Sequence, residues 1–307
     1  MHEKLQQITT EIKTVIVGKE AALTKLLVCV LAGGHVLLDD VPGVGKTTLA
    51  MAAGKALGLK YRRVQFTPDV LPSDITGFSV YSKETGKLTY MPGAVNGANI
   101  LLGDEINRTS SKTQSALLEA MEERQVTVDG TTHPLENPFM VIATQNNVGT
   151  AGTQLLPFAQ LDRFLMKLSL GYPDFDSQMA IIRDRQQGNP IENIRQVATV
   201  ADVLAMQKAV QNATLKDEVI RYIAQIAEAS RNNTHLELGI SPRGALFIAR
   251  AAKALAYVQG RDYVTPGDVR AVLVDVCAHR VILLPGGEKS PEAVLMDILE
   301  QVKPPDA

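Results

Sequence analysis

Five short, almost continuously apolar segments in the first half of the chain limit its fold more than any other feature. They lie at residues 35–40, 61–66, 98–105, 139–146 and 164–170, and polar or turn-forming residues bound each of them. Strands without polar alternation are typical of a parallel sheet that is covered on both faces. Helical patterns at residues 46–57 and 112–124 lie between the strands. The alternation predicts an α/β fold, with a five-stranded parallel sheet between helices.

Two segments interrupt this alternation and read as β-hairpins. Residues 78–90 contain two short strand-like runs around Lys83-Glu84-Thr85-Gly86. Residues 125–133 turn at Asp129-Gly130, a dipeptide that strongly favours a tight hairpin turn. Both hairpins are expected to leave the sheet and reach the surface, where partner contacts concentrate.

The pattern changes after Pro173, where the remaining segments have helical spacing. Thr265 is a good N-cap, because Pro266 follows at the first helical position and Asp268 lies in the first turn. We therefore predict an α/β core at residues 1–174, with an insert at about residues 75–96, and an all-helical domain at residues 175–307; a boundary near residues 188–190 is the alternative. The predicted helices of that domain span residues 175–187, 199–211, 217–231, 242–259, 266–278 and 291–302.

The overall composition is that of an ordinary globular protein. Hydrophobic residues make up 45% of the 307 residues, charged residues make up 21%, and the formal net charge is −2. This balance lacks the basic stripe that is typical of nucleic-acid-binding proteins, although it leaves room for a local basic patch. No apolar run is long enough to span a bilayer, and residues 1–10 lack a signal-peptide pattern, so we predict a cytoplasmic location.

The cysteines and histidines show no ligand pattern. Cys29 and Cys277 lie far apart in apolar helical patterns, which indicates two buried thiols and no disulfide. The histidines at positions 35, 133, 235 and 279 lack the spacing of metal ligands and are expected to be structural or surface residues.

The turn after the first strand has the composition of a phosphate-binding loop. Residues 41–47 read Val-Pro-Gly-Val-Gly-Lys-Thr, and a helix begins at once, which is the context that a P-loop requires. Gly43 and Gly45 permit the tight turn that aims backbone N–H groups at phosphate oxygens, next to a helix N-terminus. Lys46 is expected to contact the β- and γ-phosphates, and Thr47 to bind Mg²⁺. The usual first glycine of the loop is Asp40, so the loop is a variant.

Two acids end the third apolar strand. Asp104 is expected to hold the Mg²⁺ shell, and Glu105 to polarise the attacking water beside the γ-phosphate. Two solvated acids at a strand end are the alternative, and the P-loop makes that alternative the weaker one.

Three further polar residues are candidates for contact with the phosphates. Asn146 ends the fourth strand, where it would face the same water; the neighbouring Asn147 and a simple turn are the alternatives. Arg163 precedes the fifth strand, and Arg243 opens a helix in the second domain. An arginine neutralises charge on a transferring phosphoryl group from the same chain or from a neighbour, and a surface ion pair is the alternative for each.

In this order, these motifs resemble those of the MoxR family of AAA+ ATPases, and the resemblance covers nearly the whole chain. Phe158 stands where the family has an acid. The segments that carry the resemblance are residues 39–47, 66–77, 104–108, 117–125, 143–146 and 161–164, together with Ser241-Pro242-Arg243.

The resemblance implies a role for each candidate residue, with ATP and Mg²⁺ as cofactors. Lys46 and Thr47 match Walker A, Asp104 and Glu105 match Walker B, and Thr47 with Asp104 would bind Mg²⁺. Asn146 matches sensor 1, Arg163 the arginine finger that acts on a neighbouring subunit's ATP, and Arg243 sensor 2. The residues expected to bind ATP are Val17, Gly18, Pro42, Gly43, Val44, Gly45, Lys46, Thr47 and Thr48.

The resemblance also implies a homo-oligomer, in the family a hexameric ring, and a chaperone-like remodelling or maturation of a client protein complex. A partner with a von Willebrand factor A domain is part of this expectation, which rests on analogy. Two other functions stay open: a scaffold that binds ATP and assembles with little turnover, and an AAA+ motor on nucleic acid. The intact Glu105 argues against the first, and the near-neutral charge makes nucleic acid the weaker partner.

Overall fold

The computed structural model describes residues 2–84, 86–145, 156–186 and 188–305, and it confirms the predicted parallel sheet. Five strands lie in the order β2-β5-β8-β1-β9, and every neighbouring pair is parallel. Their bounds are β1 (Val36–Asp39), β2 (Tyr61–Gln65), β5 (Ile100–Asp104), β8 (Met140–Gln145) and β9 (Met166–Leu168). Because the strands are parallel, Asp39, Asp104 and Gln145 all end at one edge of the sheet, with Asp39 directly opposite Gln145.

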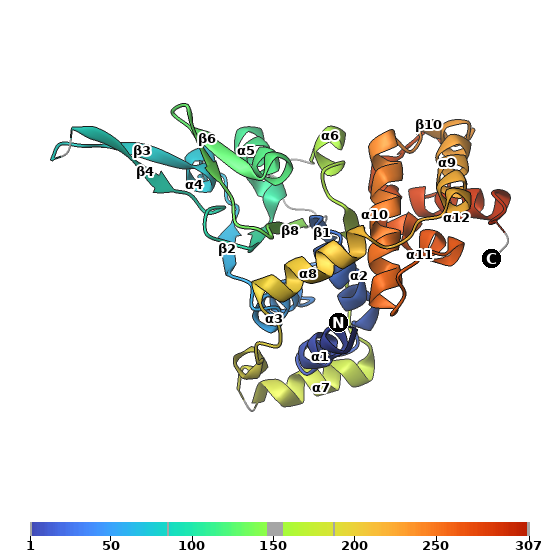
Figure 1. Ribbon diagram of the computed structural model, residues 1–307, viewed down its shortest axis with the longest axis horizontal. Helices are drawn as coiled ribbons and strands as arrows, with labels where there is room; N and C mark the ends of the chain where they lie inside the picture. The colour runs from blue at the N-terminus through green and yellow to red at the C-terminus, as the bar shows by residue number, and fades with distance from the viewer. Residues whose placement is uncertain (1, 85, 146–155, 187, 306–307) are drawn as a thin grey trace.

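The two predicted hairpins are also confirmed as antiparallel pairs. The first joins β3 (Gly77–Ser82) to β4 (Lys87–Pro92), and the second joins β6 (Gln125–Val128) to β7 (Thr131–Pro134). Asp129 and Gly130 both adopt positive φ at the turn of the second hairpin, as the sequence predicts for this dipeptide. The β3–β4 hairpin projects far from the rest of the molecule, at the left of Figure 1.

Helices cover the sheet and form most of the second half of the chain (Figure 1). The α-helices are α1 (His2–Lys13), α2 (Glu20–Leu31), α3 (Lys46–Ala56), α4 (Pro72–Thr76), α5 (Ser111–Glu123), α6 (Phe158–Leu161), α7 (Phe175–Gln186), α8 (Val200–Gln211), α9 (Asp217–Arg231), α10 (Pro242–Val258), α11 (Pro266–Cys277) and α12 (Pro291–Gln301). Short 3₁₀ turns lie at η1 (Ile106–Arg108), η2 (Pro190–Asn193) and η3 (Ala278–Arg280). The helical half also holds a small antiparallel pair, β10 (Leu236–Leu238) with β11 (Ile282–Leu283), whose strands are too short to show a period in the sequence.

Local capping explains where the helices begin. Ser241 accepts a hydrogen bond from the Gly244 N–H at the start of α10. Thr265 and Asp268 form a reciprocal capping box at the start of α11, and Arg261 adds an ion pair to Asp268 at 2.7 Å. Each such cap stabilises its helix by about 1 kcal/mol, so the predicted helix starts are physically well determined.

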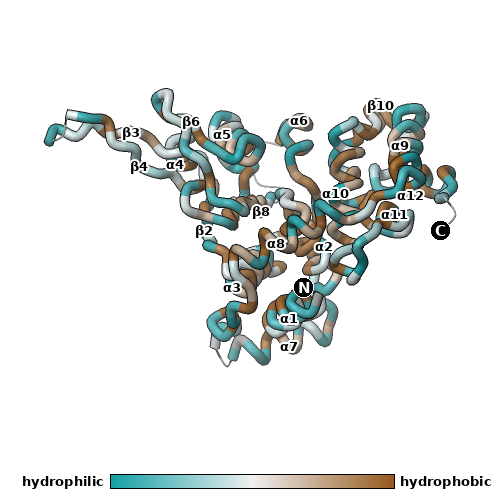
Figure 2. The backbone as a smooth tube through the Cα atoms, viewed as in Figure 1, coloured by the Kyte–Doolittle hydropathy of each residue, from teal (hydrophilic) through white to brown (hydrophobic). Residues whose placement is uncertain are grey.

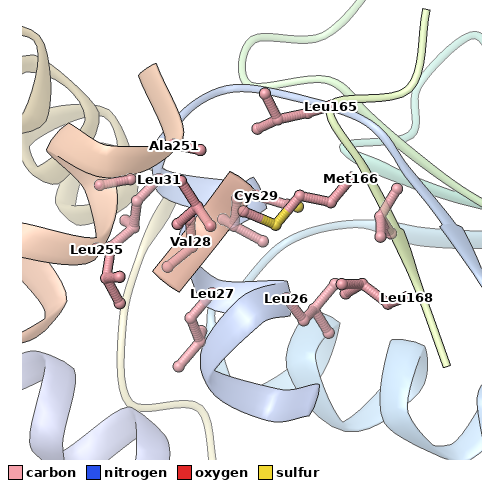
Figure 3. Packing of buried hydrophobic residues seen from close by; sticks show 14 of the residues in the cluster. Leu26, Leu27, Val28, Cys29, Leu31, Leu165, Met166, Leu168, Ala251 and Leu255 are labelled. Carbon is pink, nitrogen blue, oxygen red and sulfur yellow. The ribbon is translucent and has the colours of Figure 1, made fainter. Parts of the chain in front are cut away.

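Helix α2 joins the sheet to the helical half. It is apolar on nearly all sides, and Figure 3 shows its Leu26–Leu31 segment between Met166 and Leu168 of β9 and Ala251 and Leu255 of α10. Figure 2 colours much of the chain around α2 as hydrophobic. One cluster of buried residues runs through this contact and includes side chains from both halves of the chain. The boundary at residues 174 and 175 stays a prediction.

The predicted burial of the thiols is confirmed. Cys29 and Cys277 are both buried and unbridged, and burial raises the pKa of Cys277 to about 12. Within residues 2–84, 86–145, 156–186 and 188–305, no helix combines the length and the apolar character needed to cross a membrane.

His35 is a buried structural group that links the start of β1 to α5. Its Nδ1 accepts the Val141 N–H at 2.9 Å, so Nε2 carries the proton and donates to the Met121 carbonyl at 3.1 Å. Burial and the nearby charge of Arg124 lower the pKa of His35 to about 3. The native imidazole is therefore neutral at physiological pH.

We expect acid to weaken the fold through His35. Between its ordinary pKa of 6.5 and its native value of about 3, the unfolded chain binds a proton that the native chain does not. The free energy of unfolding should thus fall as the pH falls through this window, by up to about 1.4 kcal/mol per pH unit from this residue. Urea unfolding measured at several pH values checks this. The slope should be shallower in His35→Gln and unchanged in His235→Gln, a surface control; an unchanged slope in His35→Gln would contradict the assignment.

Candidate nucleotide-binding site

The loop between β1 and α3 has the backbone of an anion cradle. Gly43 and Gly45 adopt φ of 84° and 98°, a left-handed conformation that a side chain would strain. A Cβ atom at either position would meet no heavy atom within 4 Å, so the space beside the loop is open. Gly45 is the N-cap of α3 and offers no side-chain cap, so the first N–H groups of the helix are available to an anion.

Lys46 lies at the carboxyl edge of the sheet, as a phosphate-binding lysine requires. Its Nζ donates to the carbonyl oxygens of Asp40 at 2.7 Å and Gln145 at 3.4 Å. Burial lowers the pKa of Lys46, and the nearby carboxylates, of which Asp40 acts most strongly and Asp104 next, oppose that shift. The ammonium is therefore held among acids at the ends of β1 and β5.

Asp40, the residue in place of the first P-loop glycine, has a structural partner. Its carboxylate accepts the N–H groups of Leu170 and, at 3.2 Å, Gly171. These bonds tie the end of β1 to the chain that leaves β9. The departure from the usual loop therefore adds an anchor and leaves the glycines of the cradle in place.

A pocket of about 380 Å³ opens beside the loop. Gly18, one of the residues predicted to bind ATP, packs tightly against α7, because a Cβ atom there would lie 2.2 Å from the Ser177 Oγ. Gln178, Ile181 and Asp184 of α7 line the opposite wall. The predicted residues that line the pocket are Val17, Pro42, Gly43, Val44, Gly45 and Thr48.

Thr144, which the sequence analysis did not single out, organises the two acids of β5. Its hydroxyl donates to Asp104 Oδ1 at 3.2 Å and accepts the Glu105 N–H at 2.9 Å. Asp104 is buried and also pairs with Arg63 Nε at 2.7 Å. Thr144 is the first polar residue after the apolar run at residues 139–143, and this change is the signal that could have identified it.

Glu105 adopts a backbone conformation that is uncommon for a residue with a side chain. Its φ is 57°, and such strained positions concentrate at functional sites. The carboxylate accepts hydrogen bonds from Arg108 Nη1 at 2.9 Å and Gln65 Nε2 at 3.1 Å. These two contacts orient Glu105 beside Asp104 at the carboxyl edge of the sheet.

Arg163 and Arg243 lie together, away from the P-loop. Arg163 Nε donates to Glu122 Oε2 at 2.9 Å, and Arg243 Nη2 donates to Glu122 Oε1 at 2.6 Å. Both arginines line a pocket of about 210 Å³ with residues 33–35, which directly precede β1. They are therefore at the amino edge of the sheet, whereas Lys46 and Asp104 are at the carboxyl edge. The four residues of β1 alone separate the two edges by about 13 Å.

Thr47 and Asn146 are the two remaining candidate residues. Thr47 lies in the first turn of α3. Its hydroxyl and the carboxylate of Asp104 together would be a typical set of protein ligands for Mg²⁺. Asn146 lies outside the described residues. Together, the open glycine cradle, the uncapped helix, Lys46 and Asp104 fit a nucleoside triphosphate with Mg²⁺.

Known proteins share both the sequence pattern and this architecture. The model of a family described as the ATPase family associated with various cellular activities matches residues 35–166, and an AAA lid domain matches residues 228–301. The chain is 39% identical to the Chaperone MoxR1 of Mycobacterium tuberculosis, over 98% of this chain and 82% of that protein. It is 32% identical to the protein MoxR of Methylorubrum extorquens, over 95% of this chain and 91% of that protein.

The chain belongs to the MoxR family of AAA+ ATPases. A solved structure of a candidate ATPase from Cytophaga hutchinsonii has the same fold, with a TM-score of 0.92 at 36% identity, covering 99% of this chain and 96% of that one. The predicted architecture of the family, an AAA+ core with a helical lid, is thus confirmed.

We expect Thr144→Val to disrupt the acids of this MoxR-family site. The variant keeps the side-chain shape but leaves the buried Asp104 oxygen and the Glu105 N–H without the hydroxyl, so the free energy of unfolding should fall by about 1–3 kcal/mol. Urea unfolding measures this. Thr132→Val on the exposed β6–β7 hairpin removes a comparable hydroxyl contact and should change the free energy by less than about 0.5 kcal/mol. Equal effects in the two variants would contradict a special role for Thr144.

Proposed function

We propose that the chain binds Mg·ATP at the P-loop and hydrolyses it in a ring, where each site is completed by a neighbouring subunit. Residues 42–48 would hold the phosphates, with Lys46 as the cation, and Val17 and Gly18 would lie against the adenine. Thr47 and Asp104 would hold Mg²⁺, which neutralises charge on the phosphates when bound. Asn146, the residue that follows β8 in the sequence, is part of this proposal as a polar group for the attacking water or the γ-phosphate.

Glu105 is the proposed base that orients and activates water. It directly follows the metal-holding Asp104, so a carboxylate beside the γ-phosphate is available for the proton of the attacking water. The contacts with Gln65 and Arg108 keep this carboxylate at the carboxyl edge of the sheet. Glu105 therefore combines a fixed backbone with an oriented side chain, as general-base catalysis requires.

The separation of the arginines from the P-loop is the observation that carries the proposal of a shared site. Arg163 and Arg243 lie at the amino edge of the sheet and the P-loop at the carboxyl edge, so one chain does not bring them to its own phosphates. A second copy would bring its amino edge to the carboxyl edge of the first. Because this contact is head-to-tail, repeating it around a closed rotation generates a ring.

The proposed biological role is the remodelling or maturation of a protein complex. One relative is named a chaperone. The β3–β4 hairpin is the feature that favours a protein client, because it projects from the core and carries exposed apolar side chains. The exposed fractions of Phe78, Tyr81 and Leu88 are 49%, 61% and 62%. The hexameric ring, a partner with a von Willebrand factor A domain and a cytoplasmic location are further parts of this proposal that rest on family resemblance.

We expect Glu105→Gln to abolish turnover and to preserve ATP binding. The amide keeps the shape of the side chain but loses the basic oxygen, so the rate of phosphate release should fall by about 100-fold or more. Steady-state phosphate release and a binding titration with ATP measure the two quantities. Glu123→Gln at the exposed end of α5 is the matched control and should turn over normally. Wild-type turnover in Glu105→Gln would overturn its assignment, and ATP binding without turnover in the wild type would favour the scaffold function.

We also expect subunits of Arg163→Ala and Glu105→Gln, each inactive alone, to regain activity when mixed. A site formed by Glu105 of the first variant and Arg163 of the second is intact, so phosphate release should rise with the fraction of mixed assemblies. Light scattering confirms the assembly of each mixture. Absence of rescue in confirmed mixed assemblies would refute a site shared between subunits.

A further inference from the structure

Glu122 lies between Arg163 and Arg243 and contacts both, and the proposed function gives it no role. It lies in the last turn of α5, and each of its two carboxylate oxygens receives one of the arginines, at 2.9 Å and 2.6 Å. The two arginines come from distant parts of the chain, one before β9 and the other at the start of α10. A single carboxylate therefore brings both guanidinium groups to one position.

The buried Arg280 anchors this arrangement through Asp162. Arg280 of η3 is only 1% exposed in its side chain, and its Nε donates to Asp162 Oδ1 at 2.9 Å. Asp162 in turn lies 3.7 Å from Arg243 Nη1. The charges thus alternate along one chain of contacts, which runs Arg280, Asp162, Arg243, Glu122, Arg163.

The surroundings of Glu122 are strongly basic. Arg124 and Arg250 line the same pocket as Arg163 and Arg243, and Glu122 is the single acid among the described residues that line it. Partial burial alone would raise the pKa of Glu122, but the hydrogen bonds and charges of Arg243 and Arg163 outweigh it and hold the pKa below its ordinary value. Glu122 therefore stays ionised at neutral pH. Without it, four cations would repel one another across one small pocket.

The contact with Glu122 orients the arginines and leaves donors for another anion. A guanidinium carries five N–H donors, and Glu122 accepts a single hydrogen bond from each arginine. It binds Arg163 at Nε, on the side of the group, while Nη1 contacts the Ala159 carbonyl at 3.3 Å. The end of the Arg163 guanidinium is thus held in place without a carboxylate from the described residues, whereas Arg243 keeps Nε and its remaining N–H donors beyond Glu122 and Asp162.

We propose that Glu122 is a positioning residue, which presents Arg163 and Arg243 side by side to the phosphates of the neighbouring subunit's ATP. The proposal rests on the proposed function, because it assumes a site shared between subunits. Arginine side chains have many rotamers, and ordering them before the reaction lowers the entropy lost when the site forms. Glu122 acts through the two arginines and does not itself touch the nucleotide.

The first test is Glu122→Gln. The amide offers one accepting oxygen, and its NH₂ group would face a second guanidinium, so one arginine loses its anchor. We expect kcat for ATP hydrolysis to fall by about 10- to 100-fold, the scale of a misplaced catalytic group, with the Kd for ATP and the assembly by light scattering unchanged. Wild-type kcat would overturn the proposal, and a raised kcat would show that Glu122 restrains the arginines instead. Glu119→Gln, one turn earlier on the exposed face of α5, is the matched control and should match the wild type.

The second test separates positioning from a folding defect. Glu122→Gln subunits keep Glu105, and Glu105→Gln subunits keep a correctly held Arg163 and Arg243. Mixed assemblies should therefore regain phosphate release, because a Glu122→Gln site then receives its arginines from the other variant. A misfolded Glu122→Gln subunit has no site to rescue, so absence of rescue overturns the proposal.

A mixture of Arg163→Ala and Glu105→Gln subunits is measured beside it. This mixture distinguishes failure of the role of Glu122 from failure of the site shared between subunits. Rescue of Arg163→Ala but not of Glu122→Gln refutes the role of Glu122 and leaves the shared site intact. If neither mixture regains activity, the shared site fails, and the proposal for Glu122 fails with it.

Discussion

The burial of α2 between β9 and α10 is the contact on which the rest of the structure depends. Leu26, Leu27 and Leu31 are each nearly fully buried, and burial of a large aliphatic side chain stabilises the fold by about 1.5–3 kcal/mol. This contact sets where α10 lies, and Arg243 is the second residue of α10. An apolar helix thus determines where a charged side chain lies.

The parallel sheet sorts the polar residues between two edges. Its carboxyl edge gathers Lys46, Asp104 and Glu105, because loops that follow parallel strands meet on one side. Its amino edge gathers Arg163, Arg243 and Glu122 beside the start of β1. The cations and acids that we propose to act on one phosphate are therefore separated within the chain by the length of the strands, and the proposed contact between copies would join them.

The two edges also differ in how their side chains are held. At the carboxyl edge, the hydroxyl of Thr144 and the carbonyls of Asp40 and Gln145 fix the acids and Lys46 through hydrogen bonds to the sheet itself. At the amino edge, the arginines depend on carboxylates, since Glu122 and Asp162 are their ion-pair partners among the described residues. The carboxyl edge has ion pairs as well, from Arg63 to Asp104 and from Arg108 to Glu105, so it combines both kinds of contact.

The sequence by itself determined the local features of this protein. Continuous apolar runs, the Gly43–Gly45 turn and the caps at Ser241 and Thr265 depend on near neighbours along the chain, so the strands, the P-loop and the helix starts could be predicted. The tertiary structure alone decided which distant side chains meet. Thr144 bridges Asp104 and Glu105 because β5 and β8 are adjacent, and Glu122 joins Arg163 to Arg243 because α2 packs α10 against the sheet. The meeting at Glu122 has no signature in the sequence, because a charged residue on a helix surface looks the same whether it faces water or two arginines.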